Sequence, residues 1–281
     1  MDAAVLRRWM PEPIVEHYDA RRTILYALGI GAGRDDADLP YVYEAGLKAL
    51  PTLATVLASE GFWMEDPRFA LDAAQVFHVA EALDIHRPLP AAGAVVGRMR
   101  IEVLHHRGAG RGSLLVTART LTDAETGAVL AVSRSTMLLR GDDGEGTGDA
   151  PPRLEPPLTR DAPDRVVEIA TRPEQAALYR LSGDLNPLHL LPAAAAEAGF
   201  ERPILHGLCT FGLAGRAIVV DLAGDEPERL THLSCRFTAP VFPGETIAIE
   251  TWRQDDGAAR FRARVPERRA IVLDGGAVRW R

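Results

Sequence analysis

The chain has 281 residues, of which 47% are hydrophobic and 25% charged, and its formal net charge is −7 at pH 7. These values are ordinary for a folded globular protein and argue against a disordered chain. The negative charge argues against a nucleic-acid-binding surface, because such surfaces gather lysine and arginine to displace phosphate counterions.

The first half is expected to contain one helical segment followed by strands. Two domains of ordinary size are favoured at this length, because single cores rarely grow beyond roughly 250–300 residues. Residues 14–33 (IVEHYDARRTILYALGIGAG) have apolar side chains at helical spacing and end in glycines that can cap a helix. Alternating and β-rich patterns then predict strands at 73–82, 94–106, 112–122 and 128–139.

Residues 140–157 (RGDDGEGTGDAPPRLEPP) combine glycine, proline and acidic side chains with almost no large apolar ones, a composition typical of a linker. After it, helices are expected at 172–183, 192–200 and 207–224. Strands are expected at 164–170, 230–238, 246–253, 259–265 and 270–279. Because helices precede strands on both sides, we predict two copies of an α+β unit, at 1–139 and 158–281.

A polar cluster interrupts an apolar, alanine-rich region at residues 181–191 (LSGDLNPLHLL). The carboxylate of Asp184 can accept a proton, and His189, with an ordinary pKa near ~6.5, can give or take one near neutrality. Asn186 and Pro187 indicate a turn, since proline disfavours helix in the residue before it. The pair could hold a water molecule, whereas a turn aspartate and a structural histidine are the alternative interpretation.

His206 and Gly207 stand at the start of the apolar segment 207–224. The first turn of a helix presents unpaired backbone N–H groups and a partial positive charge, and glycine lets a ligand approach the backbone. We therefore predict an oxyanion hole at Gly207. Within the segment, Gly212 and Gly215 each cost roughly 1 kcal/mol relative to alanine, which close packing of the helix against a curved sheet would offset.

Residues 177–212 (ALYRLSGDLNPLHLLPAAAAEAGFERPILHGLCTFG) resemble the signature of the R-specific enoyl-CoA hydratases, the MaoC-like hydratases of type 2, and the hydratase unit of peroxisomal multifunctional enzymes. LYALGIGAG at 25–33, DLPYVYEAGLKALPT at 38–52 and CRFTAPVFPGETIAIETW at 235–252 extend the resemblance over nearly the whole chain. It implies an α+β double hot-dog fold, in which each of two repeats wraps a curved antiparallel sheet around a central helix. Catalysis would lie in 158–281, and 1–139 would be a degenerate repeat that helps to enclose the acyl chain.

The resemblance also implies a reaction and the residues that perform it. Asp184 and His189 would form the catalytic dyad, and the Gly207 amide would stabilise the oxyanion. Water would add to C3 of a trans-2-enoyl-CoA while a proton reaches C2, giving the (R)-3-hydroxyacyl-CoA. Which dyad residue is acid and which is base stays open. CoA would enter only as part of the substrate, with no separate cofactor and no metal.

Five further residues are candidates for support or substrate binding: Asn186, Glu44, His206, Tyr179 and Arg180. Asn186 would orient the water or lock the turn. Glu44 stands where two-domain members carry a glutamate proposed to assist the site, and a surface acid is the equal alternative. The other three are expected to support the loop. Leu191 replaces an acid that many members carry two residues after the histidine.

Three other functions stay open: an acyl carrier protein-linked 3-hydroxyacyl dehydratase, a hot-dog acyl-CoA thioesterase, and a non-catalytic acyl-CoA-binding module. The two cysteines, Cys209 and Cys235, have no metal-ligand spacing and are expected to be reduced. No long apolar run suggests a membrane span or a signal peptide. We therefore expect a cytoplasmic protein that acts on an acyl-CoA thioester without nucleic-acid or membrane partners, and a homodimeric assembly stays open.

Overall fold

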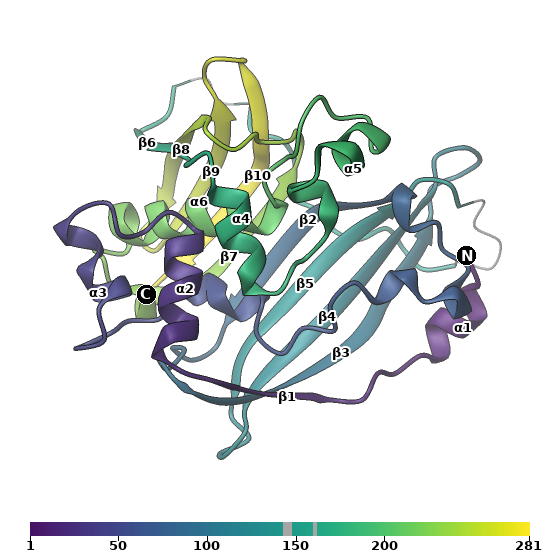
Figure 1. Ribbon diagram of the computed structural model, residues 1–281, viewed down its shortest axis with the longest axis horizontal. Coiled ribbons are helices and arrows are strands. Elements are labelled where there is room, and N and C mark those ends of the chain that lie inside the picture. Colours follow the sequence, from purple (N-terminus) through teal and green to yellow (C-terminus); the bar gives the residue numbers. More distant parts are fainter. Residues whose placement is uncertain (143–147, 160–161) are drawn as a thin grey trace.

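The computed structural model describes residues 1–142, 148–159 and 162–281 (Figure 1). Within these ranges, ten strands form one antiparallel sheet in the order β1-β3-β4-β5-β2-β7-β10-β9-β8-β6. The strands are β1 (Ile14–Tyr18), β2 (Val76–Ile85), β3 (Gly93–His106), β4 (Ser113–Asp123), β5 (Val129–Leu139), β6 (Arg165–Ala170), β7 (Leu230–Phe237), β8 (Thr246–Asp255), β9 (Ala258–Val265) and β10 (Ala270–Trp280).

The strand order repeats between the two halves of the sheet. Read from one edge, the first half runs β1-β3-β4-β5-β2, and read from the other edge, the second half runs β6-β8-β9-β10-β7. The halves meet where β2 pairs with β7, with Ala82 opposite Ser234. The α+β double hot-dog architecture expected from the sequence is confirmed, and the two half-sheets are continuous with each other.

The helices lie against the sheet and against each other (Figure 1). The α-helices are α1 (Ala3–Arg8), α2 (Ala20–Gly29), α3 (Leu39–Val42), α4 (Gln175–Tyr179), α5 (Pro192–Glu197) and α6 (Gly207–Leu222). The short 3-10 helices are η1 (Asp36–Asp38), η2 (Pro51–Thr55), η3 (Trp63–Glu65), η4 (Pro67–Phe69), η5 (Ala73–Gln75), η6 (Arg180–Ser182), η7 (Pro187–His189) and η8 (Pro227–Arg229). None of the helices within the described ranges is long and apolar enough to cross a membrane.

The long helix α6 forms the centre of the core. Most of its side chains are buried, as expected for a helix that is apolar on nearly every face. A Cβ on Gly212 would lie 2.6 Å from a methyl carbon of Ile30, and one on Gly215 would lie 2.8 Å from a methyl carbon of Thr52. The two glycines therefore let α2 and η2 approach the helix closely. In the first half it is the short η2, rather than a long helix, that packs against β2 and β5.

Several sequence-based boundaries were wrong, and three of them are informative. Residues 14–18 form an edge strand paired with β3, and the helix begins only at Ala20, because Asp19 caps it by accepting a hydrogen bond from Arg22 N. The expected strand at 73–82 starts at Val76, after η5. The expected helix at 172–183 is divided into α4 and η6. In the first two cases an aspartate, Asp19 or Asp72, caps a short helix where the pattern had looked continuous.

The expected linker at 140–157 falls partly outside the described residues, at 143–147. Within its described remainder, Glu155 and Pro156 bond to Arg260 of the second half, whereas Asp149 is fixed to the first half, because its carboxylate accepts a hydrogen bond of 2.8 Å from Leu104 N. Asp149 also pairs with Arg7 at 3.0 Å. The domain bounds 1–139 and 158–281 stay a prediction.

Candidate active site

The segment that carries the dyad is a tight turn between α4 and α5. Gly183 has a φ of 120°, a conformation that side-chain-bearing residues rarely adopt, and it turns the chain out of η6. Asp184 Oδ1 then accepts a hydrogen bond from Asn186 N at 3.1 Å, and Asn186 Oδ1 accepts one from Leu188 N at 3.0 Å. The side chain of Asn186 is thus the cap of η7. These two bonds lock the turn and place His189 at the end of η7.

His189 is buried, with 9% of its surface exposed, and its Nδ1 lies 2.9 Å from the carbonyl oxygen of Ile204. A carbonyl can only accept, so we assign the proton to Nδ1 and a lone pair to Nε2. Burial lowers the pKa of His189 below its ordinary value, although the charge of Asp184 and the bond to Ile204 act in the opposite direction. His189 is therefore neutral near pH 7, with Nε2 ready to accept a proton.

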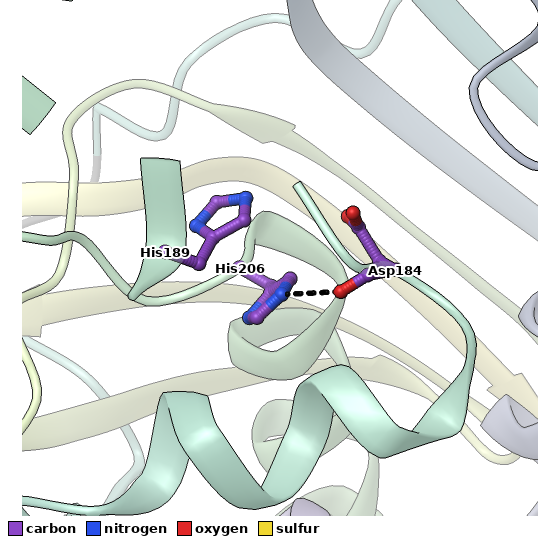
Figure 2. A group of neighbouring side chains, drawn as sticks. All are labelled: Asp184, His189 and His206. Carbon is purple, nitrogen blue, oxygen red and sulfur yellow. Dashed lines mark hydrogen bonds between the residues drawn. The ribbon is translucent and has the colours of Figure 1, made fainter. Parts of the chain in front are cut away.

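His206 supports both members of the dyad. Its ring stacks on that of His189, with centroids 3.7 Å apart and planes inclined by 27°, and its Nε2 donates to the main-chain oxygen of Asp184 at 3.1 Å (Figure 2). Burial lowers the pKa of His206 to about 3, helped next by repulsion from His189 once that ring is protonated. His206 therefore stays neutral and fixes the backbone of Asp184 against the ring of His189.

The spacing of the dyad suits a bridging water molecule. One carboxylate oxygen of Asp184, one ring nitrogen of His189 and one ring nitrogen of His206 lie within 4.8 Å of one another. Two hydrogen bonds of about 2.8 Å that meet at a water molecule connect partners about 4.6 Å apart. In Figure 2 the carboxylate of Asp184 and the ring of His189 face each other across the space beside His206. One water molecule can therefore bond to both catalytic candidates.

The same three residues are of the types that bind metal ions, but their arrangement does not suit a metal. An ion binds an imidazole nitrogen in the plane of the ring, at about 2.0–2.1 Å. The rings of His189 and His206 are stacked, 3.7 Å apart and only 27° from parallel, so no point lies in both planes at that distance from both rings. The arrangement favours proton transfer, and the absence of a metal stays a prediction.

Gly207 is the first residue of α6 and follows His206 directly. The amides of Cys209 and Thr210 bond to the carbonyl of His206, whereas the amide of Gly207 precedes the first of these intrahelical bonds. The Gly207 amide lies at the positive end of a sixteen-residue helix and directly follows the residue whose ring stacks on His189. Its role as an oxyanion donor stays a prediction.

Tyr179 and Arg180 lie behind the dyad, at the junction of α4 and η6. The buried ring of Tyr179 lies 5.0 Å from that of His206, and burial raises the pKa of its hydroxyl well above the ordinary value. The charge of Arg180 contributes to the lowered pKa of His206, so its guanidinium is close to the histidine pair. Leu191, which replaces the family's acid, is 52% exposed at the start of α5.

Glu44 is not brought to the dyad. It is exposed, in a bend between Tyr41 and Lys48. The hydroxyl of Tyr41 donates to the carboxylate of Asp225 at 2.5 Å, and the ammonium of Lys48 donates to the main-chain oxygen of Asp225 at 3.1 Å. Asp225 lies just beyond the C-terminal end of α6, whereas the dyad lies at its N-terminal end. A sixteen-residue helix is about 24 Å long. The segment that carries Glu44 is therefore anchored at the far end of α6.

Arg22 is a contributor that the sequence did not reveal. From α2 it donates to the main-chain oxygen of Ser182 at 3.0 Å and to that of Leu181 at 3.4 Å, directly before the dyad turn. Its Nε also pairs with Glu16 at 3.3 Å. No local pattern could have found this contact, because Arg22 and Ser182 are 160 residues apart.

The surroundings of the dyad are apolar and exposed. Four leucines close to it in sequence are at least 40% exposed: Leu181, Leu185, Leu190 and Leu191. A separate hollow of about 580 Å³ lies between the β8–β9 turn and the C-terminus and includes Arg229 and Arg281. Arg229 donates to Ala223 O at the end of α6, so this hollow lies far from the dyad. The histidine rings lie at the dyad, and none lies among the described residues that line this hollow, so the candidate site is at the dyad.

Comparisons with known proteins show the family of the chain. An MFE-2 hydratase 2 N-terminal domain matches residues 17–141, and a MaoC like domain matches residues 155–274. The 3-hydroxyacyl-thioester dehydratase Y of Mycobacterium tuberculosis is 37% identical over 96% of this chain and 95% of its own length. The peroxisomal enoyl-CoA hydratase 2 of Arabidopsis thaliana is 35% identical over 92% of this chain and 89% of its own length.

Among solved structures, a MaoC-like dehydratase from Phytophthora capsici superposes with a TM-score of 0.86 at 30% identity and covers 100% of this chain and 99% of that one. Both domain matches, the full-length relatives and the superposition agree in order and extent. The chain belongs to the family that joins an MFE-2 hydratase 2 N-terminal domain to a MaoC-like domain.

Proposed function

We propose that this enzyme of the hydratase/dehydratase type reversibly hydrates trans-2-enoyl-CoA to (R)-3-hydroxyacyl-CoA, in fatty-acid β-oxidation. The observation that carries the proposal is the pairing of a neutral His189, held by Ile204 through Nδ1, with Asp184: one ring nitrogen and one carboxylate oxygen lie within 4.8 Å of each other, close in the fold to the residue that precedes α6. Relatives named as a 3-hydroxyacyl-thioester dehydratase and an enoyl-CoA hydratase support the reaction type.

Charge develops in this reaction on the thioester oxygen. The oxygen of water bonds to C3 while the electron pair of the C2–C3 double bond moves towards C1, which gives an enolate. The Gly207 amide would donate to the enolate oxygen, at the positive end of α6. One such donor is typically worth about 10²–10³ in rate.

The tautomer of His189 suggests how the protons move. Nε2 has a lone pair and Nδ1 is occupied by Ile204, so His189 is a base before the reaction and has no proton to give to C2. We infer that Nε2 takes a proton from the water as C3–O forms and then returns that proton to C2 on the same face. Asp184 would accept the second hydrogen of the water and aim its oxygen at C3. In total, one water molecule is added to the substrate, and His189 and Asp184 return to their starting protonation states.

The proposal is tested by following trans-2-enoyl-CoA of short, medium and long chain. Hydration removes the conjugated enoyl-thioester absorbance and releases no thiol, and chiral separation identifies the product. The expected result is (R)-3-hydroxyacyl-CoA, with activity strongly reduced in Asp184→Asn. Full activity of Asp184→Asn, or an (S) product, would refute the mechanism.

The same assay separates the other candidate functions. Thiol release would indicate a thioesterase, and tight binding without turnover an acyl-CoA-binding module. The name of the Mycobacterium tuberculosis relative does not specify the thioester carrier, so substrates on acyl carrier protein should be compared with their CoA equivalents. Preference for the carrier-bound form would make the chain a carrier-linked dehydratase. A cytoplasmic location stays a prediction, since the Arabidopsis thaliana relative is named as peroxisomal.

A further inference from the structure

The start of α6 rests on an aromatic ring from the sheet. A Cβ placed on Gly207 would lie 3.3, 3.4 and 3.5 Å from three carbons of the Phe237 ring. These distances are tighter than ordinary van der Waals contact, so the Gly207 backbone lies directly on this ring with no side chain between them. Phe237 is the last residue of β7 and is half-buried. The position of the proposed oxyanion donor therefore depends on where this ring lies.

The ring of Phe237 is braced from the first half of the chain. His78 of β2 meets it at its edge, with centroids 4.8 Å apart and planes inclined by 62°. The Nε2 of His78 lies 3.0 Å from Ala80 O and 3.1 Å from Glu81 Oε2, both of which accept, so we assign a proton to it. This bond fixes the ring plane of His78 and therefore the edge that supports Phe237.

A bulge in β2 makes this contact possible. The pairing of β2 with β5 slips between His78 and Ala80, which leaves Val79 as an extra residue. An extra residue moves the preceding side chains to the opposite face of a strand. His78 and Glu81, which would lie on opposite faces of a regular strand, thus share one face.

Glu81 anchors the group. Its side chain is fully buried, and it accepts hydrogen bonds from Ser135 at 2.7 Å, from Ser133 and from His78. A buried carboxylate with three donors, all on strands of the first half, is fixed in position. Glu81, His78 and Phe237 thus form a continuous line of contacts from β2 and β5 to the start of α6.

We propose that Phe237, held by His78 and Glu81, is a positioning residue for the Gly207 amide, an inference that rests on the proposed function. The first half, which has no dyad of its own, would in this way hold the oxyanion donor of the second half. Hydrogen bonds to a developing oxyanion depend strongly on geometry, and a misplacement of 1 Å can cost about 10²-fold in rate.

The test compares Phe237→Leu with Phe77→Leu. Phe77 directly precedes His78 in β2, so the two side chains lie on opposite faces of the strand, and Phe77 packs under Arg140. Its replacement removes the same atoms from a position away from Gly207. We expect Phe237→Leu to lower kcat about 10-fold with KM changed less than about threefold, and Phe77→Leu to change kcat less than about twofold. Equal kcat in Phe237→Leu and the wild type would overturn the proposal.

A double-mutant cycle shows whether the two residues act together. In the wild type, Gly207→Ala drives a methyl group against Phe237, whereas in Phe237→Leu the shorter side chain leaves room for it. We expect Gly207→Ala to cost at least about fivefold less kcat in the Phe237→Leu background. If the kcat loss of the double variant equals the product of the two single losses, Phe237 only fills the core. That result would overturn the proposal.

Amide hydrogen exchange makes the test independent of turnover. Mass spectrometry gives the exchange rate of the amides in a peptide that covers residues 203–212. This rate should be at least about fivefold higher in Phe237→Leu than in the wild type, and it should be unchanged in Phe77→Leu. If the wild type does not hydrate enoyl-CoA, the proposed function fails, yet the exchange still decides whether Phe237 positions the start of α6. Unchanged exchange in Phe237→Leu would overturn the inference in either case.

Discussion

Replacing His189 by asparagine should abolish most of the activity while keeping the fold. The amide nitrogen of asparagine can take the place of Nδ1 and donate to Ile204 O, which His189 contacts at 2.9 Å, but asparagine has no base in the place of Nε2. Losing general acid–base help typically costs 10²–10⁴-fold in rate, or about 3–5 kcal/mol in the activation free energy. His189→Ala should lose the same activity and in addition about 1–3 kcal/mol of folding free energy, because it leaves the Ile204 carbonyl without its donor.

The assay is the steady-state disappearance of the enoyl-thioester absorbance, together with thermal unfolding of each variant. The expected pattern is an equally low kcat for both variants and a Tm lowered mainly in His189→Ala. If His189→Asn kept kcat within about threefold of the wild type, His189 would not be the base and the assignment of its tautomer would have no catalytic meaning.

Four further outcomes are expected. The kcat/KM of the wild type should be level above pH 6.5 and fall at lower pH, because burial lowers the pKa of His189 and only its neutral form accepts a proton; a fall that begins above pH 7 would contradict this. The free energy of unfolding, from urea titrations, should decrease as the pH drops from 6.5 towards 3, because over that range the unfolded chain binds a proton that folded His206 rejects; His206→Asn should flatten this slope. Gly212→Ala should destabilise the protein by up to about 2 kcal/mol, since the contact at 2.6 Å outweighs the gain in helix propensity, whereas the exposed Gly148→Ala should be nearly neutral. Glu44→Gln should change kcat less than about twofold, because its segment is anchored at Asp225; a loss of tenfold or more would show that Glu44 reaches the site.

Local signals in the sequence determined most of the elements and the dyad. The strands of both halves and the helix at 207–222 follow from periods of two and from an apolar run, which depend only on neighbouring residues. Asp184, Asn186 and His189 lie in one turn whose side chain–backbone bonds span two residues, so their proximity could be inferred from spacing. The strand at 14–18 was missed because its apolar residues also fit a helix.

The tertiary structure alone decided how distant residues meet at the site. The bond from Arg22 to Ser182, the stack of His206 on His189 and the seat of Gly207 on Phe237 join residues between 17 and 160 positions apart. No local period encodes such contacts, because they depend on how the continuous sheet and α6 pack as a whole. The same packing buries His189 and lowers its pKa, and it fixes the tautomer through Ile204. Residue types and spacing thus determined which groups could react, while burial and packing decided which proton each one holds.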